Sequence, residues 1–259
     1  MDQPPINIRI CRDSIDLPEL YARLNDTLSA RGFVSEEIIT TDAGPIVAWK
    51  RIVADDRPTI YLSAGMHGDE PSGPLAVEAF WREDHPQEFN WMICPILNPT
   101  GIRARTRDNA QGMDMNRDYL MRHTREVQHH AAWLEQQVVP DLFLSLHEDW
   151  ETDGFYFYEI SLHDDHPQRA HRILEAVRSH CAIEKNTSID DHVVREEGWI
   201  HHEPQADFPD SWPEAIFLAK RGCPLSFTFE TPSCAVPLAQ RVAAHGAAIR
   251  AALQSLQGG

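Results

Sequence analysis

The sequence contains very little lysine and a large excess of acidic residues. Only three of its 23 basic residues are lysines, and 40 acidic residues leave a formal net charge of −17. A surface of that sign repels phosphate backbones and anionic lipid headgroups. We therefore expect no nucleic-acid partner and no membrane partner.

Long apolar runs and paired cysteines are absent as well. No apolar run approaches the roughly 18 residues that cross a bilayer, and the first residues, MDQPPINIRI, lack the basic-then-apolar layout of a secretory signal. The sequence therefore predicts a cytoplasmic protein. Its cysteines are odd in number and never in a C-x-x-C pair, which argues against a disulfide framework and a thiolate zinc site. Free thiols are expected at Cys11, Cys94, Cys181, Cys223 and Cys234.

The overall composition is that of a globular domain. The chain has 259 residues, 42% hydrophobic content, 13 glycines and 18 prolines, which excludes a disordered or fibrous protein. A chain of this length buries roughly three quarters of its unfolded surface, so it needs no disulfide or metal merely to fold. No repeat, low-complexity tract or linker divides it, and we predict one domain over residues 1–259.

Strand-like and helix-like segments alternate along the chain. Apolar runs predict strands at 47–53, 59–64, 91–97, 141–146, 155–160 and 225–229. Helical periodicity predicts helices at 73–83, 124–138, 168–180, 212–221 and 237–256. A turn is expected at 98–101 and a loop at 184–210. This alternation predicts an α/β fold with a mixed, largely parallel twisted sheet and helices on both faces.

The first candidate site, His67-Gly68-Asp69-Glu70, follows the strand 59–64 directly. An imidazole and a carboxylate at this H-x-x-E spacing suit a zinc ion. The spacing alone is weak evidence, because it occurs twice more in a chain with 14 histidines. This copy differs because its glycine-containing loop follows a strand, at the sheet edge where α/β proteins bind ligands. A loop capped by its own polar groups is the equal alternative.

Two further strands end in residues of suitable chemistry. His147 follows the strand 141–146, and it faces the same edge as His67 if the two strands are parallel neighbours. Two histidines and one glutamate leave a fourth metal position for water, as in catalytic zinc sites. Glu230 closes the strand 225–229, where a carboxylate could act as general base and then protonate a leaving amine. The alternatives are a histidine bonded to nearby carboxylates and a glutamate that caps the next turn.

Arginine is concentrated in one stretch of this acidic chain. Six of the basic residues are Arg103, Arg105, Arg107, Arg117, Arg122 and Arg125. Planar guanidinium groups suit carboxylate recognition and oxyanion stabilisation. The alternative is a solvated basic face that pairs with Asp108, Asp114 and Asp118.

Four segments together resemble the zinc carboxypeptidase A superfamily, which includes murein peptide amidases, succinylglutamate desuccinylases and aspartoacylases. In chain order they are GMHGDEPSG (65–73), NPTGIRARTRDNAQGMDMNRDY (98–119), LSLHEDW (144–150) and FTFETPS (227–233). Their order and spacing are far more specific than any one segment, and the resemblance spans residues 59–233, with no family motif in 1–45. It implies the three-layer fold of the zinc carboxypeptidases and one zinc ion per chain.

The resemblance also implies the metal centre and the base. His67, Glu70 and His147 match the zinc ligands of the superfamily, and Glu230 matches the general base that acts on zinc-bound water. The same four residues were selected above because they follow predicted strands and have side chains that suit a metal site or a general base.

Three more residues match substrate-handling positions of the superfamily. Arg107 matches the arginine that polarises the scissile carbonyl and stabilises the oxyanion. Asn116 and Arg117 match the pair that holds the free carboxylate of the substrate. The resemblance therefore implies a substrate with a free carboxylate, either a small peptide or an N-acyl amino acid.

One part of the superfamily pattern is missing. The carboxypeptidases carry a tyrosine some twenty residues before the catalytic glutamate, whereas the last tyrosine here is Tyr158. Phe208 and Trp212 occupy the equivalent stretch, with His201 and His202 a little upstream as alternative donors.

We predict a zinc-dependent metallocarboxypeptidase or peptide amidase that hydrolyses an amide bond next to a free carboxylate, using metal-activated water and a glutamate base. The alternatives are an N-acyl amino acid amidohydrolase of the desuccinylase/aspartoacylase type and a catalytically inert metal-binding protein of the same fold. Desuccinylases and aspartoacylases carry a further C-terminal β domain, whereas only 29 residues follow Glu230 here, so the peptidase type is favoured.

Overall fold

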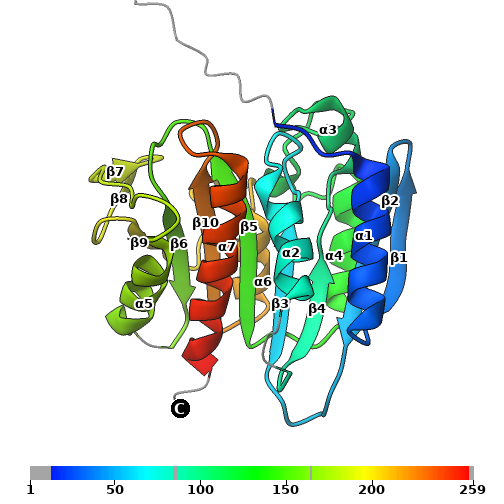
Figure 1. Ribbon diagram of the computed structural model, residues 1–259, viewed down its shortest axis with the longest axis horizontal. Helices are drawn as coiled ribbons and strands as arrows, with labels where there is room; N and C mark the ends of the chain where they lie inside the picture. The colour runs from blue at the N-terminus through cyan, green and yellow to red at the C-terminus, as the bar shows by residue number, and fades with distance from the viewer. Residues whose placement is uncertain (1–12, 84–86, 164, 257–259) are drawn as a thin grey trace, which may run out of the picture.

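An eight-stranded mixed sheet organises the chain (Figure 1). The computed structural model describes residues 13–83, 87–163 and 165–256. The strands of this sheet are β1 (Val34–Thr41), β2 (Gly44–Arg51), β3 (Thr59–Ala64), β4 (Asn90–Cys94), β5 (Leu142–Asp149), β6 (Tyr156–Ser161), β9 (Trp199–His201) and β10 (Leu225–Pro232). Their spatial order is β1-β2-β4-β3-β5-β10-β6-β9. The central strands β4, β3, β5 and β10 are parallel, and β2 and β6 flank them in antiparallel pairing.

Helices cover both faces of the sheet, as the sequence predicted (Figure 1). One face carries α1 (Leu17–Ala30), α2 (Ser72–Arg82), α5 (Pro167–Val177) and α7 (Leu238–Leu253). The opposite face carries α4 (Arg125–Glu135) and α6 (Glu214–Lys220). The two helix layers pack on the sheet through two separate apolar cores, so the predicted α/β class is confirmed.

The central strands are apolar along their whole length because both of their faces are covered. Every residue of β3 and β4 is buried. Alternate side chains enter opposite cores: Ile60 and Leu62 of β3 belong to one core, whereas Tyr61 belongs to the other. Continuous apolar runs therefore identify the middle of this sheet.

Two strands extend further than the sequence predicted. β5 runs to Asp149 and β10 to Pro232, so His147 and Glu230 lie within strands and not just beyond them. The ladder continues through polar residues because the two strands pair with each other in parallel as far as Asp149 and Pro232. Pairing with a neighbour, which the local sequence does not reveal, decides where these strands end.

The turn predicted at 98–101 is the start of a helix. Asn98 Oδ1 accepts a hydrogen bond from the Gly101 backbone N–H over 2.8 Å and caps α3 (Pro99–Ala104). Pro99 occupies the first helical position, where a missing N–H has no cost. The residues that are typical of a turn here begin a short helix.

The polar segment predicted as a loop at 184–210 contains short strands. These are β7 (Ser188–Ile189), β8 (His192–Val193) and β9, which adds to the sheet beside β6. Residues 1–45, in which no motif was found, supply α1 and β1. Strands of two or three residues are too short for a periodic pattern, and tertiary pairing alone specifies them.

Cys94, Cys181 and Cys223 are buried free thiols, as predicted, and Cys234 is half-buried and forms no disulfide, whereas Cys11 lies outside the described residues. None of the helices in the described part of the chain has the length and apolarity that a bilayer crossing requires.

The buried histidine of α4 makes stability depend on pH. His130 lies between the hydroxyls of Tyr61 and Tyr119 at 2.8 and 2.7 Å, and burial lowers its pKa to about 3. An unfolded histidine titrates near ~6.5, so below that pH the unfolded state binds one more proton and stability falls as pH falls. Between about pH 6 and pH 4, we expect the free energy of unfolding to fall less steeply with falling pH in His130→Gln than in the wild type. The difference in slope is expected to be up to about 1.4 kcal/mol per pH unit.

Urea unfolding at a series of pH values measures this difference. His129→Gln, on the exposed side of the same helix, is the control and should keep the wild-type slope. An unchanged slope in His130→Gln would show that His130 is not held neutral by burial.

Candidate active site

The carboxyl ends of β3, β5 and β10 meet at one edge of the sheet. Parallel pairing places Ala64 beside Leu146, and His147 beside Glu230. His67 follows the end of β3 by three residues. The residues that the sequence placed at separate strand ends therefore lie at the same edge, where α/β proteins bind ligands.

A close backbone contact shapes the loop that carries His67. A Cβ atom on Gly68 would lie 1.8 Å from the carbonyl carbon of Gly101 in α3, so only glycine permits this approach. The Gly68 backbone N–H donates to the Thr106 carbonyl oxygen over 2.9 Å. The loop after β3 is thus joined to the segment after α3, and this contact brings Arg107 next to His67.

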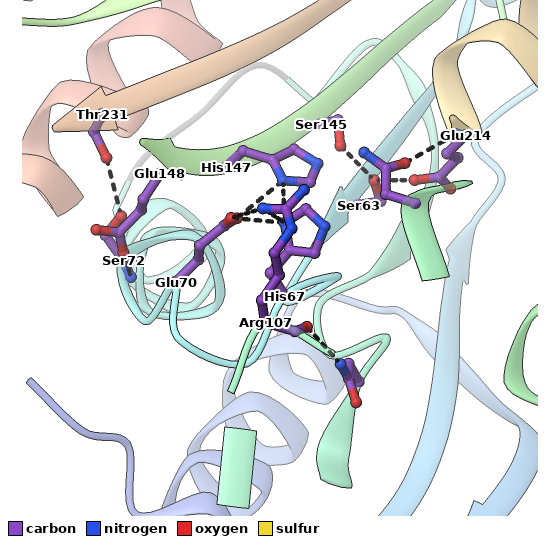
Figure 2. A network of polar contacts seen from close by, with 12 residues as sticks. Ser63, His67, Glu70, Ser72, Arg107, Ser145, His147, Glu148, Glu214 and Thr231 are labelled. Carbon is purple, nitrogen blue, oxygen red and sulfur yellow. Dashed lines mark hydrogen bonds and ion pairs between the residues drawn. The ribbon is translucent and has the colours of Figure 1, made fainter. Parts of the chain in front are cut away.

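The side chains of His67, Glu70 and His147 converge (Figure 2). His67 Nδ1 lies 2.6 Å from Glu70 Oε1, and His147 Nδ1 lies 2.9 Å from Glu70 Oε2. The two Nδ1 atoms are 3.3 Å apart. All three side chains are buried. Donor atoms from two segments, the loop after β3 and strand β5, therefore face one another and are almost inaccessible to solvent.

This donor set fits a transition metal. Two nitrogen ligands of a tetrahedral ion with bonds of about 2.05 Å are about 3.3 Å apart, and the two Nδ1 atoms have this separation. Imidazole and carboxylate together favour zinc or a neighbouring divalent ion over magnesium or calcium. Three protein ligands leave a coordination position open, which is the arrangement of a catalytic site.

Asp114 holds His67 and Arg107 in place, although the sequence had indicated it only as a partner of arginine. His67 Nε2 lies 3.1 Å from Asp114 Oδ1, and Arg107 donates to Asp114 Oδ2 from Nε and Nη2 over 3.1 and 2.9 Å. A carboxylate on the second nitrogen of a ligating histidine fixes the ring orientation and tautomer. The signal that could have identified Asp114 is its position two residues before Asn116 in the same motif.

Burial and charge shift the pKa values of the two glutamates in opposite directions. Burial raises the pKa of Glu70, but the neighbouring His67 and His147 outweigh it and leave the pKa lowered. Burial first, and the charge of Glu70 second, raise the pKa of Glu230 well above its usual range. Glu70 is therefore the ionised group of the pair, whereas Glu230 binds a proton more readily, as a general base requires.

The converging side chains open into a cavity of about 640 Å³. Its lining includes all seven residues that the family resemblance assigned to the site: His67, Glu70, Arg107, Asn116, Arg117, His147 and Glu230. The other four arginines of the cluster are not part of the lining. Two of them have partners elsewhere, because Arg122 pairs with Glu135 and Arg103 donates to the Asp42 backbone oxygen. The arginine cluster thus divides into a cavity pair and a surface set.

Glu214, at the start of α6, positions Asn116. Its backbone N–H donates to Asn116 Oδ1 over 3.0 Å, so the donors of the Asn116 amide group are left for other partners. The Glu214 carboxylate accepts hydrogen bonds from the hydroxyls of Tyr61 and Ser63, both over 2.8 Å. Burial raises its pKa to about 7. The sequence did not predict that Glu214 positions Asn116, because a single glutamate in a predicted helix has no pattern that indicates such a contact.

Tyrosine side chains reach the cavity from a strand that the sequence had not connected with the site. Antiparallel pairing of β6 with β10 places Tyr156 opposite Glu230, and both Tyr156 and Tyr158 line the cavity. Their hydroxyls donate to Asp149 and Asp190, each over 3.1 Å. Phenol donors are therefore present, although not at the sequence position where they were sought.

The other residues considered as replacements for the family tyrosine divide into two groups. His202 and Phe208 line the cavity. His201 and Trp212 are not part of its lining.

Several solved structures share this fold. A crystal structure of a "putative metallopeptidase" from Shewanella denitrificans OS217 has a TM-score of 0.81 and 25% identity, covering 93% of this chain and 90% of that chain. A metallo-carboxypeptidase from Burkholderia cenocepacia has a TM-score of 0.68 and 17% identity, with coverages of 93% and 69%. A metallo-carboxypeptidase from Pseudomonas aeruginosa, in complex with (2-guanidinoethylmercapto)succinic acid, has a TM-score of 0.68 and 18% identity, with coverages of 94% and 69%. These neighbours show the fold, and His67, Glu70 and His147 form a group that could hold a metal ion.

Removing the Asp114 carboxylate tests whether it orients a metal ligand. We expect Asp114→Ala to weaken metal binding about 10- to 100-fold, because His67 loses the partner of its second nitrogen. Competition with a chelator of known affinity measures the change. Asp108→Ala, in the same segment, is the control, and equal affinities in the two variants would contradict the role of Asp114.

A family model, the succinylglutamate desuccinylase/aspartoacylase catalytic domain, matches residues 56–196. No curated protein matches the sequence significantly. The matched residues are more than half of the chain and include His67, Glu70, Arg107 and His147, whereas Glu230 lies beyond them. The family model and the structural neighbours support a hydrolase of the metallopeptidase or desuccinylase/aspartoacylase type. The chain belongs to the family of the succinylglutamate desuccinylase/aspartoacylase catalytic domain.

Proposed function

We propose that this protein is a zinc-dependent hydrolase that cleaves an amide bond next to a free carboxylate, as a metallocarboxypeptidase or peptide amidase. The observation that carries the proposal is the register of β5 and β10, which sets Glu230 beside His147 at the cavity that the donors of His67 and Glu70 also reach. The three candidate metal ligands, a half-buried carboxylate outside that set and two arginines thus share one cavity.

His67, Glu70 and His147 would hold one zinc ion. When bound, zinc would polarise the amide carbonyl as a Lewis acid and would lower the pKa of a water molecule, so that the water loses a proton more readily and becomes a better nucleophile. Glu230 would take the proton from that water and give it to the leaving amine, because its raised pKa favours holding a proton between the two steps.

Arg107 would donate hydrogen bonds to the carbonyl oxygen as negative charge develops on it. Asp114 already holds the guanidinium through Nε and Nη2, so Nη1 remains directed toward the donors of the metal site, 3.2 Å from His67 Nδ1. A preorganised cation needs little rearrangement during the reaction.

Asn116 and Arg117 would bind the free carboxylate of the substrate. The Glu214 backbone N–H donates to Asn116 Oδ1 and fixes the orientation of the amide, so the Asn116 NH2 group would be the donor to the carboxylate. Arg117 is exposed at the cavity and can offer a bidentate pair of N–H donors. Together they would select substrates with a carboxylate beside the scissile bond.

A second candidate is deacylation of an N-acyl amino acid, which the family model favours. Both reactions would use the same metal ligands, general base and carboxylate-binding residues. They differ in the group on the acyl side of the amide. A panel of dipeptides with free C-termini against N-acetyl and N-succinyl amino acids separates them. Activity confined to the acyl compounds would reject the peptidase proposal.

We expect Glu230→Gln to lower kcat about 10²- to 10⁴-fold, because it removes the proton acceptor. Metal content should stay unchanged, since Glu230 is not among the three converging donors. His67→Ala is the matched variant that should lose the metal. Glu151→Gln, which changes another glutamate of the cavity, should retain turnover. Full turnover in Glu230→Gln would remove this residue from the mechanism.

Arg117→Ala should raise KM about tenfold for substrates with a free carboxylate and leave kcat nearly unchanged, because a charge-assisted hydrogen bond shared by ground and transition states is lost. Steady-state kinetics on a free and a C-terminally amidated form of the same substrate measures this effect. If both forms suffer equally, Arg117 does not recognise the carboxylate.

A further inference from the structure

A second group of metal-binding side chains lies in the wall of the same cavity. His192 belongs to β8, His202 follows β9, and Asp207 lies in the loop that leads toward α6. One ligand atom from each of the three lies within 4.8 Å of the others. None of them belongs to the site formed by His67, Glu70 and His147.

The spacing of these atoms suits a shared ion better than direct hydrogen bonds. His192 Nε2 lies 3.5 Å from Asp207 Oδ2, and His202 Nε2 lies 3.4 Å from Asp207 Oδ1. Ordinary N–H···O bonds measure about 2.7–3.2 Å. Two ligands of one tetrahedral zinc ion are about 3.3 Å apart, so both separations are close to those of ligands around one centre.

The orientation of His202 leaves a lone pair for a metal. Its Nδ1 lies 2.6 Å from the backbone oxygen of Glu203, and since a carbonyl oxygen only accepts, Nδ1 carries the proton. In the neutral ring, Nε2 is then the unprotonated nitrogen, and this is the atom that faces Asp207. A backbone carbonyl is one of the common partners for the second nitrogen of a metal-bound histidine.

The surroundings hold both imidazoles in place. The two rings contact each other with centroids 4.8 Å apart, and the Tyr158 ring lies 5.5 Å from His192 and 6.0 Å from His202. The Tyr158 hydroxyl in turn donates to Asp190 over 3.1 Å. Asp190 and Asp191 line the same cavity wall and add negative charge that favours a cation.

We infer that His192, His202 and Asp207 form a second site for a divalent transition metal, separate from the centre of the proposed amide hydrolysis. Two imidazoles with one carboxylate suit zinc, cobalt, nickel or copper and not magnesium or calcium. Asp207 is 51% exposed, so the remaining coordination positions are open to water and to the cavity. Such an ion connects β8, the end of β9 and the loop before α6, and it stabilises this wall when it is bound.

Zinc stoichiometry tests the inference. The purified protein is dialysed against micromolar ZnCl2, and bound metal is measured by mass spectrometry. We expect about two zinc ions per chain in the wild type and about one in each of His202→Ala, Asp207→Asn and His67→Ala. The double variant His67→Ala/His202→Ala should bind almost none. His171→Ala, which removes an exposed histidine paired with Glu196, is the control and should keep the wild-type value.

Thermal unfolding gives a second readout that does not depend on activity. Added zinc should raise the Tm of His67→Ala, in which only the second site is intact, and should leave the Tm of the double variant unchanged. Asp207→Asn preserves the shape of the side chain, so a loss of metal there does not arise from misfolding. One zinc ion per wild-type chain that is lost in His67→Ala and retained in His202→Ala would overturn the second site and leave the proposed hydrolase function intact.

Discussion

A carboxylate buried between two imidazoles is the constraint on which the candidate active site depends. Glu70 is buried, and an isolated charge in such a place costs several kcal/mol, on the order of the stability of a whole domain. Cationic or proton-donating partners must therefore surround it, and they come from the loop after β3, from β5 and from the segment after α3. The positions of His67, His147 and Arg107 are consequently coupled through one charge.

The strand that carries His147 is anchored from its other side. Glu148, the next residue of β5, accepts a hydrogen bond from the Ser72 backbone N–H over 2.6 Å and pairs with the buried Arg241 of α7. Burial raises the pKa of Glu148 to about 7, although Arg241 opposes this shift. Thr231 of β10 lies 3.3 Å from the Ser72 hydroxyl (Figure 2). Alternation along β5 thus directs His147 toward Glu70 and Glu148 toward its anchors in α2 and α7, which keeps the donor geometry rigid.

The two histidine clusters of the cavity differ in how firmly the fold supports them. The first is buried and stands on or beside central parallel strands. The second stands on a two-residue strand, just after a three-residue strand and in a loop, and it includes a half-exposed aspartate. Binding is tighter when ligands are already held in place, because less ordering is required. The cavity therefore combines a firmly held cluster on the central strands with a less firmly held cluster in its wall.

Continuous apolar runs determined the central strands and the α/β class, and the order of four motifs determined which residues meet at the cavity, because both signals are local in the chain. The sequence did not reveal Asp114 as the partner of His67, Glu214 as the support of Asn116 or Tyr156 as a neighbour of Glu230. Each of these contacts joins segments far apart in sequence, as in the 98 positions between Asn116 and Glu214. Only the tertiary structure decided them, because strand order and register, which result from packing over the whole sheet, set which polar side chains face one another.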